Sequence, residues 1–559
     1  MNFTDQIPLP LRSRLLRRSG PKAWRKPRLH STQLVLVGVA VVVVALILLV
    51  PAYLILRMAG AGRETVEILS KGNTVEILLN TMVLAGSVTF AAAIIAVPVA
   101  WLTVCSDLPG KRIWAVLAAL PLVLPSYVAA FVYMTVLTPK GLLQQLLEPW
   151  TGIERLPSLL GFPGAFVVLT FISYPFILLP VRAALKRMDP SLMEAARSLG
   201  SSPRQAFVRV TLPYLRPSIV AGGLLVTLYV IRDFGAVTMW QYSTFTRIIY
   251  NRYLSYRLDT AAALALVVVV ITISILCLES RSRGKARYER LSTGAARQPR
   301  LVKLGPWKWP AQLFLGSLVM ATLVLPTVGL LIWLWRGWIQ DWSVHSSGGS
   351  ASNLQLLTSL FQPAWSSLSV SLMAALLAVI LALPIAILVV RRPSRLSRFM
   401  ERLTYIGFAL PGLVVALALV FFGIQYAPSF YQTVPMMLAA YVILFIPQTV
   451  GSQRASLLQI SSGLEEAARS LGRRPLSVFR RVTFPLVLPG VVAGGALVFL
   501  TSMKELPATL ILSPLGFTTL STQVWTNINE AFFARAAAPT LLLLLLSSLP
   551  LALLTLRDQ

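Results

Sequence analysis

Two carboxylates are the first candidates for chemistry, because each follows a basic residue within a largely apolar stretch. Asp233 follows Arg232, and Glu505 follows Lys504 at a position 272 residues later. Ionisable side chains at membrane depth are costly and usually face a cavity or one another. Carboxylate oxygens also suit a hard cation better than thiols do. Asp233 and Glu505 are therefore candidates for lining a cation path. Neighbouring ion pairs that extend toward the membrane interface are the alternative, and we give it more weight.

A second cluster of oxygen-bearing side chains follows the first carboxylate. It consists of four tyrosines, Tyr242, Tyr250, Tyr253 and Tyr256. A tyrosinate oxygen can bind a ferric ion, so a receiving site is conceivable. An aromatic belt at the membrane interface explains the tyrosines more simply, and we prefer that interpretation.

Other reactive residues are scarce. The chain has two cysteines and two histidines, all far apart in the sequence, and it has no G-x-x-x-x-G-K-[S/T] stretch. No disulfide framework, zinc spacing or nucleotide-binding loop is therefore predicted. A membrane enzyme has little support, and we predict no catalytic residue, no firmly assigned metal ligand and no cofactor bound by this chain.

The elements that position these residues are expected to be membrane helices. The 559 residues are 56% hydrophobic and 13% charged, whereas soluble domains average about 45–50% and about 25%. Soluble and disordered classes are thus excluded. A bilayer core of about 30 Å needs about 20 apolar residues per helix. Twelve runs meet this need, at roughly 33–56, 77–104, 113–137, 164–181, 217–235, 260–278, 311–335, 366–390, 403–424, 434–453, 490–506 and 538–556.

The net charge of +30 raises the possibility of a nucleic-acid partner. Membrane proteins, however, concentrate Lys and Arg in cytoplasmic loops. If both termini are placed in the cytoplasm and the spans alternate, most of the 50 Lys and Arg residues fall on the cytoplasmic side. We therefore predict a multi-pass protein of the bacterial inner membrane, with cytoplasmic termini and no nucleic-acid partner.

The chain contains an internal repeat. Residues 194–223 read EAARSLGSSPRQAFVRVTLPYLRPSIVAGG, and residues 466–495 read EAARSLGRRPLSVFRRVTFPLVLPGVVAGG. Each half carries six spans in the same order, and an even number makes the two repeats parallel. The predicted fold is all-α, with a basic cytoplasmic tail at 1–31, a first transmembrane half at 32–280, a cytoplasmic linker at 281–308 and a second half at 309–559.

The best-matched part of the repeat is a loop between spans, at about 189–216 and 461–488. We expect each loop to form a helical hairpin. Capping boxes are predicted at Ser191-x-x-Glu194 and Ser462-x-x-Glu465. Gly200 and Gly472 suit the left-handed position after a helix end. The paired prolines have separate predicted roles: Pro203 and Pro475 begin the second helix, whereas Pro213 and Pro485 end it before the next span.

Such a hairpin has two possible roles. It can simply pack beneath the bundle, or it can dock a cytoplasmic partner by inserting a helix into a groove. The residues alone leave these readings about equally open. Two related hairpins suit a partner with two-fold symmetry.

The repeated motif resembles the coupling-loop signature of ABC importer permeases with type I architecture. The pattern E-A-A-x(3)-G with a distal L-P stands here as Glu194-Ala195-Ala196…Gly200…Leu212-Pro213 and as Glu466-Ala467-Ala468…Gly472…Phe484-Pro485. Phe484 departs mildly from the usual leucine. The resemblance covers about 76–279 and 364–555.

The stretches 232–237 and 504–509, with Phe245-Thr246 and Phe517-Thr518 downstream, resemble the fused two-half permeases for ferric iron. This likeness implies an importer of ferric iron. Relatives of the same fold carry thiamine, phosphonates, polyamines or sulfate, so these remain alternative solutes.

The resemblance also implies partners and a mechanism. A periplasmic binding protein would deliver the solute, and two copies of a separate ATPase would hold ATP and Mg and receive one hairpin each. Glu194 and Glu466 would anchor the coupling helix, and the two glycines would allow its sharp turn. The halves would rock about a central path in alternating access. A twelve-helix secondary transporter is the rival class, although it does not require two matching hairpins.

Overall fold

The computed structural model describes residues 31–60, 72–152, 155–283, 301–339 and 358–557. The predicted tail at 1–31 lies almost wholly outside these residues, as does the middle of the linker. The described part is almost entirely helical and contains a single isolated β-bridge, between Ser106 and Val302.

The first half contains the helices α2 (Ser31–Gly60), α4 (Gly72–Cys105), α5 (Lys111–Leu117), α6 (Ser126–Leu137), α7 (Leu142–Thr151), α8 (Phe162–Ser173), α9 (Pro175–Arg187), α10 (Pro190–Ser198), α11 (Pro203–Ala206), α12 (Leu212–Arg232), α13 (Gly235–Met239), α14 (Phe245–Leu254) and α15 (Leu258–Arg283).

The second half contains α16 (Lys308–Val319), α17 (Leu325–Ile339), α19 (Phe361–Arg391), α20 (Arg395–Ala409), α21 (Gly412–Tyr426), α22 (Val434–Gln459), α23 (Ser462–Ser470), α24 (Pro475–Val478), α25 (Phe484–Met503), α26 (Pro507–Leu512), α27 (Leu520–Asn529) and α28 (Phe533–Arg557).

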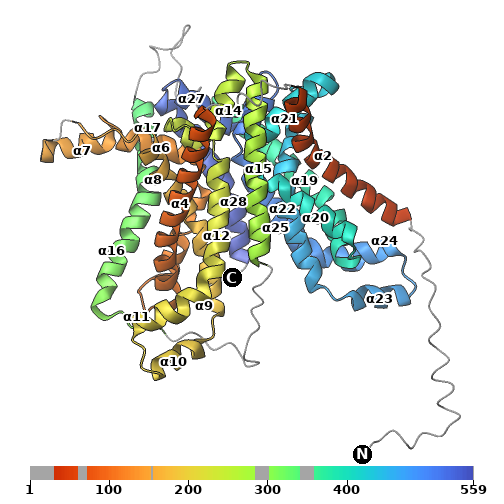
Figure 1. The fold of residues 1–559 in the computed structure, drawn as a ribbon, viewed down its shortest axis with the longest axis horizontal. Coiled ribbons are helices and arrows are strands. Elements are labelled where there is room, and N and C mark those ends of the chain that lie inside the picture. Colours follow the sequence, from red (N-terminus) through yellow and green to blue (C-terminus); the bar gives the residue numbers. More distant parts are fainter. Residues whose placement is uncertain (1–30, 61–71, 153–154, 284–300, 340–357, 558–559) are drawn as a thin grey trace, which may run out of the picture.

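Each half is built around three long helices that pack on one another. They are α4, α9 and α12 in the first half and α19, α22 and α25 in the second. The two sets form the left and right parts of the bundle in Figure 1. Buried residues from both sets belong to one continuous apolar core. The predicted all-α fold of two parallel halves is therefore confirmed.

The first span of each half packs against the opposite half. Helix α2 contacts α19, α20 and α21 of the second half, and α17 contacts α6 of the first half. Each also contacts the last helix of its own half: α17 packs on α28, and α2 packs on α15 with an ion pair between Arg57 and Asp259 at 2.7 Å. The two halves are thus interlocked by their first helices, which we did not predict.

Every predicted apolar run coincides with helix, but not every run is one straight span. Among the described residues, ten helices are long and apolar enough to cross a membrane, or eleven if the bent pair α20–α21 counts as one span. That pair bends by 103° at Leu410-Pro411, and the run 113–137 is likewise broken before Pro125. A residue that precedes proline is driven out of the helical region, so the predicted spans at 113–137 and 403–424 each contain a break at proline.

Three other prolines are accommodated without a break. A π-helical turn lies two residues before each of them, at Phe207–Thr211 before Pro213, at Phe479–Thr483 before Pro485 and at Met320–Val324 before Pro326. The wider turn makes room for a ring that would otherwise clash with the preceding turn. Our prediction that Pro213 and Pro485 end a helix was therefore wrong, because α11–α12 and α24–α25 each run on continuously.

The described end of the linker is attached to the first half. The Val302 amide donates to the Cys105 carbonyl at 2.8 Å, and the Leu304 amide donates to the Asp107 carboxylate at 2.9 Å. Lys308 lies 2.8 Å from the same carboxylate and, with the Leu304 amide, lowers the pKa of Asp107. Because its pKa is lowered, the Asp107 carboxylate is still charged at the ordinary pKa of an aspartate. The contact is lost only as the pH falls through the lowered pKa.

Candidate functional site

The two hairpins lie at the same end of the bundle, on opposite flanks (Figure 1). We call α10–α11 the first hairpin and α23–α24 the second hairpin. The second helix of each begins at its proline, Pro203 or Pro475, as predicted. This common end fits the sequence prediction that both hairpins lie on one side of the membrane.

Each hairpin turns on a glycine in the left-handed region. The φ angle is +84° at Gly200 and +76° at Gly472, which confirms the predicted conformation. After the first helix, the Gly200 amide donates to the Arg197 carbonyl at 3.0 Å, and the Ser201 amide donates to Ala196 at 3.1 Å. The second hairpin repeats both bonds. This pair of bonds defines a Schellman motif, which closes a helix end most readily with glycine.

The N-terminal caps of the two hairpins differ from the prediction. Asp189 accepts from the Ser191 amide, and Ser461 accepts from the Gly463 amide. The predicted capping boxes at Ser191 and Ser462 were therefore wrong. The true caps are equivalent positions of the repeat, 272 residues apart, and both can form the same short side-chain bond to the helix.

The second hairpin is fastened to the bundle by a carboxylate that we did not single out. Glu465 is 7% exposed, and its Oε1 lies 2.9 Å from Arg391 Nε on α19. The Thr483 hydroxyl donates to the same oxygen at 3.1 Å. Glu466, the residue that matches the family motif, is exposed. Its assignment to the coupling loop, and that of Glu194, stay predictions.

The corresponding contact in the first hairpin carries no charge. Met193 occupies the place of Glu465, and Cys105 that of Arg391. There the Thr211 hydroxyl contacts the Met193 sulfur at 3.1 Å. The sequence contained a signal for the anchoring position. Met193 and Ala196 are three residues apart and so mark the inward face of α10. Glu465 aligns with Met193 on that face.

The predicted carboxylates lie at the ends of α12 and α25 that point away from the hairpins. Asp233 is 6% exposed, and its Oδ1 accepts from the Ala236 amide at 2.9 Å and from the Val237 amide at 3.3 Å. Glu505 Oε1 accepts from the Ala508 amide at 3.3 Å. Each carboxylate thus begins the short helix that follows it, and their place on a cation path stays a prediction.

The basic residues beside them cross to the opposite half. Arg232 donates to the Phe408 carbonyl and lies over the Phe408 ring at 5.2 Å. Lys504 donates to the Leu122 carbonyl at 3.2 Å. Leu122 and Phe408 occupy equivalent positions, each just before a Leu-Pro break. We call these two contacts the crossed pair. They replace the ion pairs within each half that were the alternative reading.

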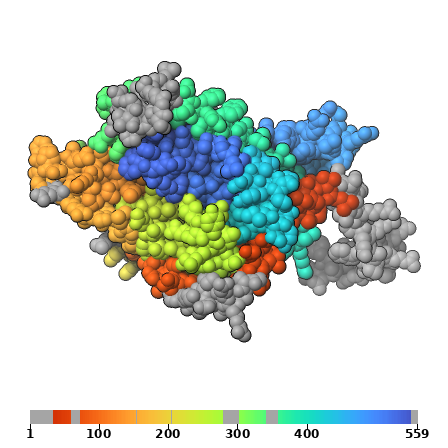
Figure 2. Space-filling model, turned by 90° about the horizontal axis from the view of Figure 1, so that it is seen from above, coloured from red at the N-terminus to blue at the C-terminus, as the bar shows by residue number. Residues whose placement is uncertain are grey.

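The crossed pair joins the two halves beside the ends of α12 and α25. Arg232 also interacts electrostatically with Glu505 of the other half. Phe234 packs against Trp525 at 5.1 Å and against Tyr250 at 4.8 Å. Seen from the end opposite the hairpins, segments of the two halves adjoin across the middle of the face (Figure 2).

The four tyrosines have different surroundings, although Tyr253 interacts electrostatically with Tyr250 and Tyr256. Tyr242 packs against Phe162 and donates to the Asn80 carbonyl, whereas Tyr250 packs on Phe234. Tyr256 is 90% exposed. These separate surroundings favour the preferred reading of structural and interfacial aromatics. Among the described residues, no group of three or more His, Cys, Asp or Glu side chains could hold a metal ion.

We expect Lys504→Met to weaken the contact between the halves. The variant leaves the part-buried Leu122 carbonyl without its charged donor, which costs about 1–3 kcal/mol. Thermal unfolding of the purified protein in detergent, followed by tryptophan fluorescence, is expected to shift to lower temperature. Lys504→Arg retains a donor and serves as the control. Equal unfolding temperatures for Lys504→Met and the unmodified protein would contradict this role.

Comparison with known proteins finds the same family domain in both halves. The family model described as the binding-protein-dependent transport system inner membrane component matches residues 106–280 and again 374–559. The Fe(3+)-transport system permease protein FbpB 2 of Haemophilus influenzae is 36% identical over 506 residues, which are 90% of this chain and 94% of that protein.

Two further relatives match less completely. The ferric transport system permease protein FbpB of Actinobacillus pleuropneumoniae is 24% identical over 81% of this chain and 66% of its own length. The spermidine/putrescine transport system permease protein PotB of Escherichia coli is 33% identical over 27% of this chain and 56% of its own length.

Proposed function

The chain belongs to the family of binding-protein-dependent transport system inner membrane components, and from this premise we propose that it is the permease subunit of an ATP-driven importer of ferric iron. It carries both transmembrane halves of the transporter in one polypeptide. A periplasmic binding protein delivers the iron, and two copies of a separate ATPase subunit supply the energy. ATP and Mg are held by those subunits.

The observation that carries the coupling part of the proposal is the matched pair of hairpins. They occupy equivalent places in the two family domains, lie at one end of the bundle and share the same left-handed turn. Leu199 and Leu471, which precede the two glycines, are 86% and 83% exposed. Exposed apolar side chains at the tip of a rigid hairpin suit insertion into a groove of a partner.

Motion of the hairpins has a direct route to the carboxylates. The helix that leaves each hairpin continues without a break through its π turn into α12 or α25. Those helices end at Arg232 and at Met503, next to Lys504. When the ATPase pair closes, it draws the hairpins together, and the rigid helices transmit that shift to the crossed pair. The two halves then rock about the path.

The cargo is supported by a relative that aligns with most of this chain. The Haemophilus protein is named for Fe(3+) transport and aligns with 90% of this chain. A polyamine is the second candidate, and it rests on a match to only 27% of the chain. Thiamine, phosphonate and sulfate have no comparable support in these relatives.

The test is uptake of radioactive iron in proteoliposomes that contain this chain, its ATPase and its binding protein. We expect accumulation of ⁵⁵Fe(III) that requires both ATP and the binding protein, and no accumulation of labelled spermidine. Co-purification of the ATPase with the tagged chain separates this class from a secondary transporter. Uptake that continues without ATP, driven by an ion gradient, would refute the proposal.

A further inference from the structure

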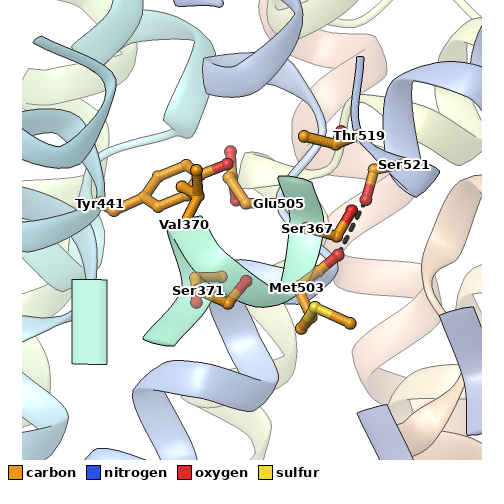
Figure 3. A pocket seen from close by; sticks show the side chains of 9 residues that line it. Ser367, Val370, Ser371, Tyr441, Met503, Glu505, Thr519 and Ser521 are labelled. Carbon is orange, nitrogen blue, oxygen red and sulfur yellow. Dashed lines mark hydrogen bonds between the residues drawn. The ribbon is translucent and has the colours of Figure 1, made fainter. Parts of the chain in front are cut away.

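The second half contains a small cavity beside Glu505. Its volume, measured for the centre of a water-sized sphere, is about 10 Å³, which is close to the space that one water molecule requires. Seven of its nine lining residues carry a side-chain oxygen, among them Ser367, Ser371, Tyr441 and Ser521. Figure 3 shows Tyr441 beside Glu505 on one side and Ser367 and Ser521 on the other.

Several of these oxygens are oriented to accept. The Ser521 hydroxyl donates to the Met503 carbonyl at 2.8 Å, and Ser502 donates to Val498 at 2.8 Å. A hydroxyl that donates its hydrogen to a carbonyl still has oxygen lone pairs that can accept. The nearby Tyr127 hydroxyl is buried without a well-aligned hydrogen-bond partner, although Ser521 lies beside it and Glu505 interacts with it electrostatically.

Glu505 itself has fewer partners than its counterpart in the first half. Asp233 accepts from two backbone amides and from the Ser126 hydroxyl. At the position equivalent to Ser126, the second half has Gly412. A Cβ at Gly412 would lie 2.2 Å from Glu505 Oε1, so the carboxylate occupies the space of the missing side chain and has no hydroxyl donor there. Its one hydrogen bond among the described residues is the amide of Ala508.

The first half carries fewer side-chain oxygens at the positions that line this cavity. At the positions of the second half's polar residues it carries Leu169 for Tyr441, Ala85 for Ser371 and Val230 for Ser502. These replacements remove three oxygens, while Asp233 keeps the hydroxyls of Ser126 and Thr246 as polar neighbours. The asymmetry therefore lies in the sequence of the two repeats and does not depend on one conformation of the protein.

We propose that the Glu505 cavity is a binding site for one hard metal cation, present in the second half alone, and that Asp233 is a positioning residue that binds no cation. This site adds detail to the proposed function. The identification of its cation as the transported iron rests on that function. One carboxylate with several hydroxyls suits a hard cation. Such a site binds weakly enough to release its ion, as a transport path requires.

Arg232 ties this site to the arrangement of the halves. Its guanidinium belongs to the first half and interacts electrostatically with Glu505 while it is bonded to the Phe408 carbonyl. A positive charge beside the carboxylate opposes cation binding. When the halves separate, Arg232 moves away from Glu505 and the cation affinity rises. The site thus binds more tightly in the open arrangement than in the closed one.

The experiment measures Tb³⁺ luminescence in the purified full-length chain. Tb³⁺ is a hard trivalent cation, and neighbouring tyrosines sensitise its emission. We expect saturable emission that Ga³⁺ displaces. Glu505→Gln is expected to weaken binding at least tenfold. Gly412→Ser places a Cβ 2.2 Å from the present position of Glu505 Oε1, so it displaces the carboxylate and is expected to weaken binding at least threefold. Arg232→Gln is expected to strengthen binding at least threefold.

Asp233→Asn is the matched control and is expected to leave Tb³⁺ affinity within twofold. Unfolding temperature and gel-filtration profile verify that each variant is folded. Unchanged affinity in both Glu505→Gln and Gly412→Ser overturns the site, and so does a tenfold loss in Asp233→Asn. Absence of ⁵⁵Fe uptake by a complex that still binds Tb³⁺ through Glu505 would refute iron as the cargo but not the site.

Discussion

Replacing Gly200 and Gly472 together with valine is expected to lower ⁵⁵Fe uptake more than tenfold. Both glycines have positive φ angles, and a Cβ at either position meets no atom within 4 Å. The effect of valine is therefore one of backbone conformation and not of crowding. A β-branched residue in the left-handed region costs about 1–3 kcal/mol, which opens the Schellman turn that sets the angle of each hairpin.

The same variant is expected to keep ATP hydrolysis while it loses uptake. The ATPase itself is intact, and only the angle of the hairpins that contact it is changed. Asparagine tolerates the left-handed region, so Gly200→Asn with Gly472→Asn is expected to retain most of the uptake. Gly86→Val is the matched control, since Gly86 has equally open space and no positive φ. Full transport by the valine variant would show that the left-handed turns are not needed for coupling.

Replacing Glu465 with methionine is expected to release the second hairpin from the bundle. The variant leaves Arg391 without its carboxylate in a site where the two side chains are 16% and 9% exposed. Removing one partner of a buried ion pair costs about 3–5 kcal/mol. Hydrogen exchange of the α23 amides reports this local opening, and we expect it to become at least 100-fold faster.

A second substitution, taken from the equivalent contact in the first half, is expected to restore the protection of α23 in this variant. Arg391→Cys together with Glu465→Met reproduces Cys105 and Met193 of the first half. The double variant removes both charges, so most of the protection of α23 is expected to return. Glu466→Gln, at an exposed position, is expected to leave exchange unchanged. Normal protection in Glu465→Met alone would show that the ion pair does not anchor the hairpin.

Two neighbouring glutamates of the second hairpin, Glu465 and Glu466, have different surroundings. The resemblance directs attention to Glu466 because it matches Glu194. The structure places Glu465 against α19 and leaves Glu466 exposed. In the proposed transporter, Glu465 fixes the hairpin to the permease and Glu466 faces the motor. The hydrogen-exchange measurements above test the anchoring role of Glu465 separately from Glu466.

The sequence alone determined the class of protein, its two parallel halves and the position of both hairpins. These features follow from local rules: apolar runs long enough to span a bilayer, a repeat at constant spacing, and glycines that a helix end requires. Local rules were less reliable at proline. They correctly begin helices at Pro203 and Pro475 but wrongly end them at Pro213 and Pro485, where a π turn absorbs the ring.

Only the tertiary structure revealed which groups meet. Arg391 and Glu465 are 74 residues apart, and Lys504 reaches a carbonyl 382 residues away. Every residue has a backbone carbonyl, so no sequence pattern can indicate that the Leu122 carbonyl is the one that Lys504 contacts. The unequal surroundings of Asp233 and Glu505 arise in the same way. Residues 126 and 412 differ by one hydroxymethyl group, and packing alone brings each of them beside its carboxylate.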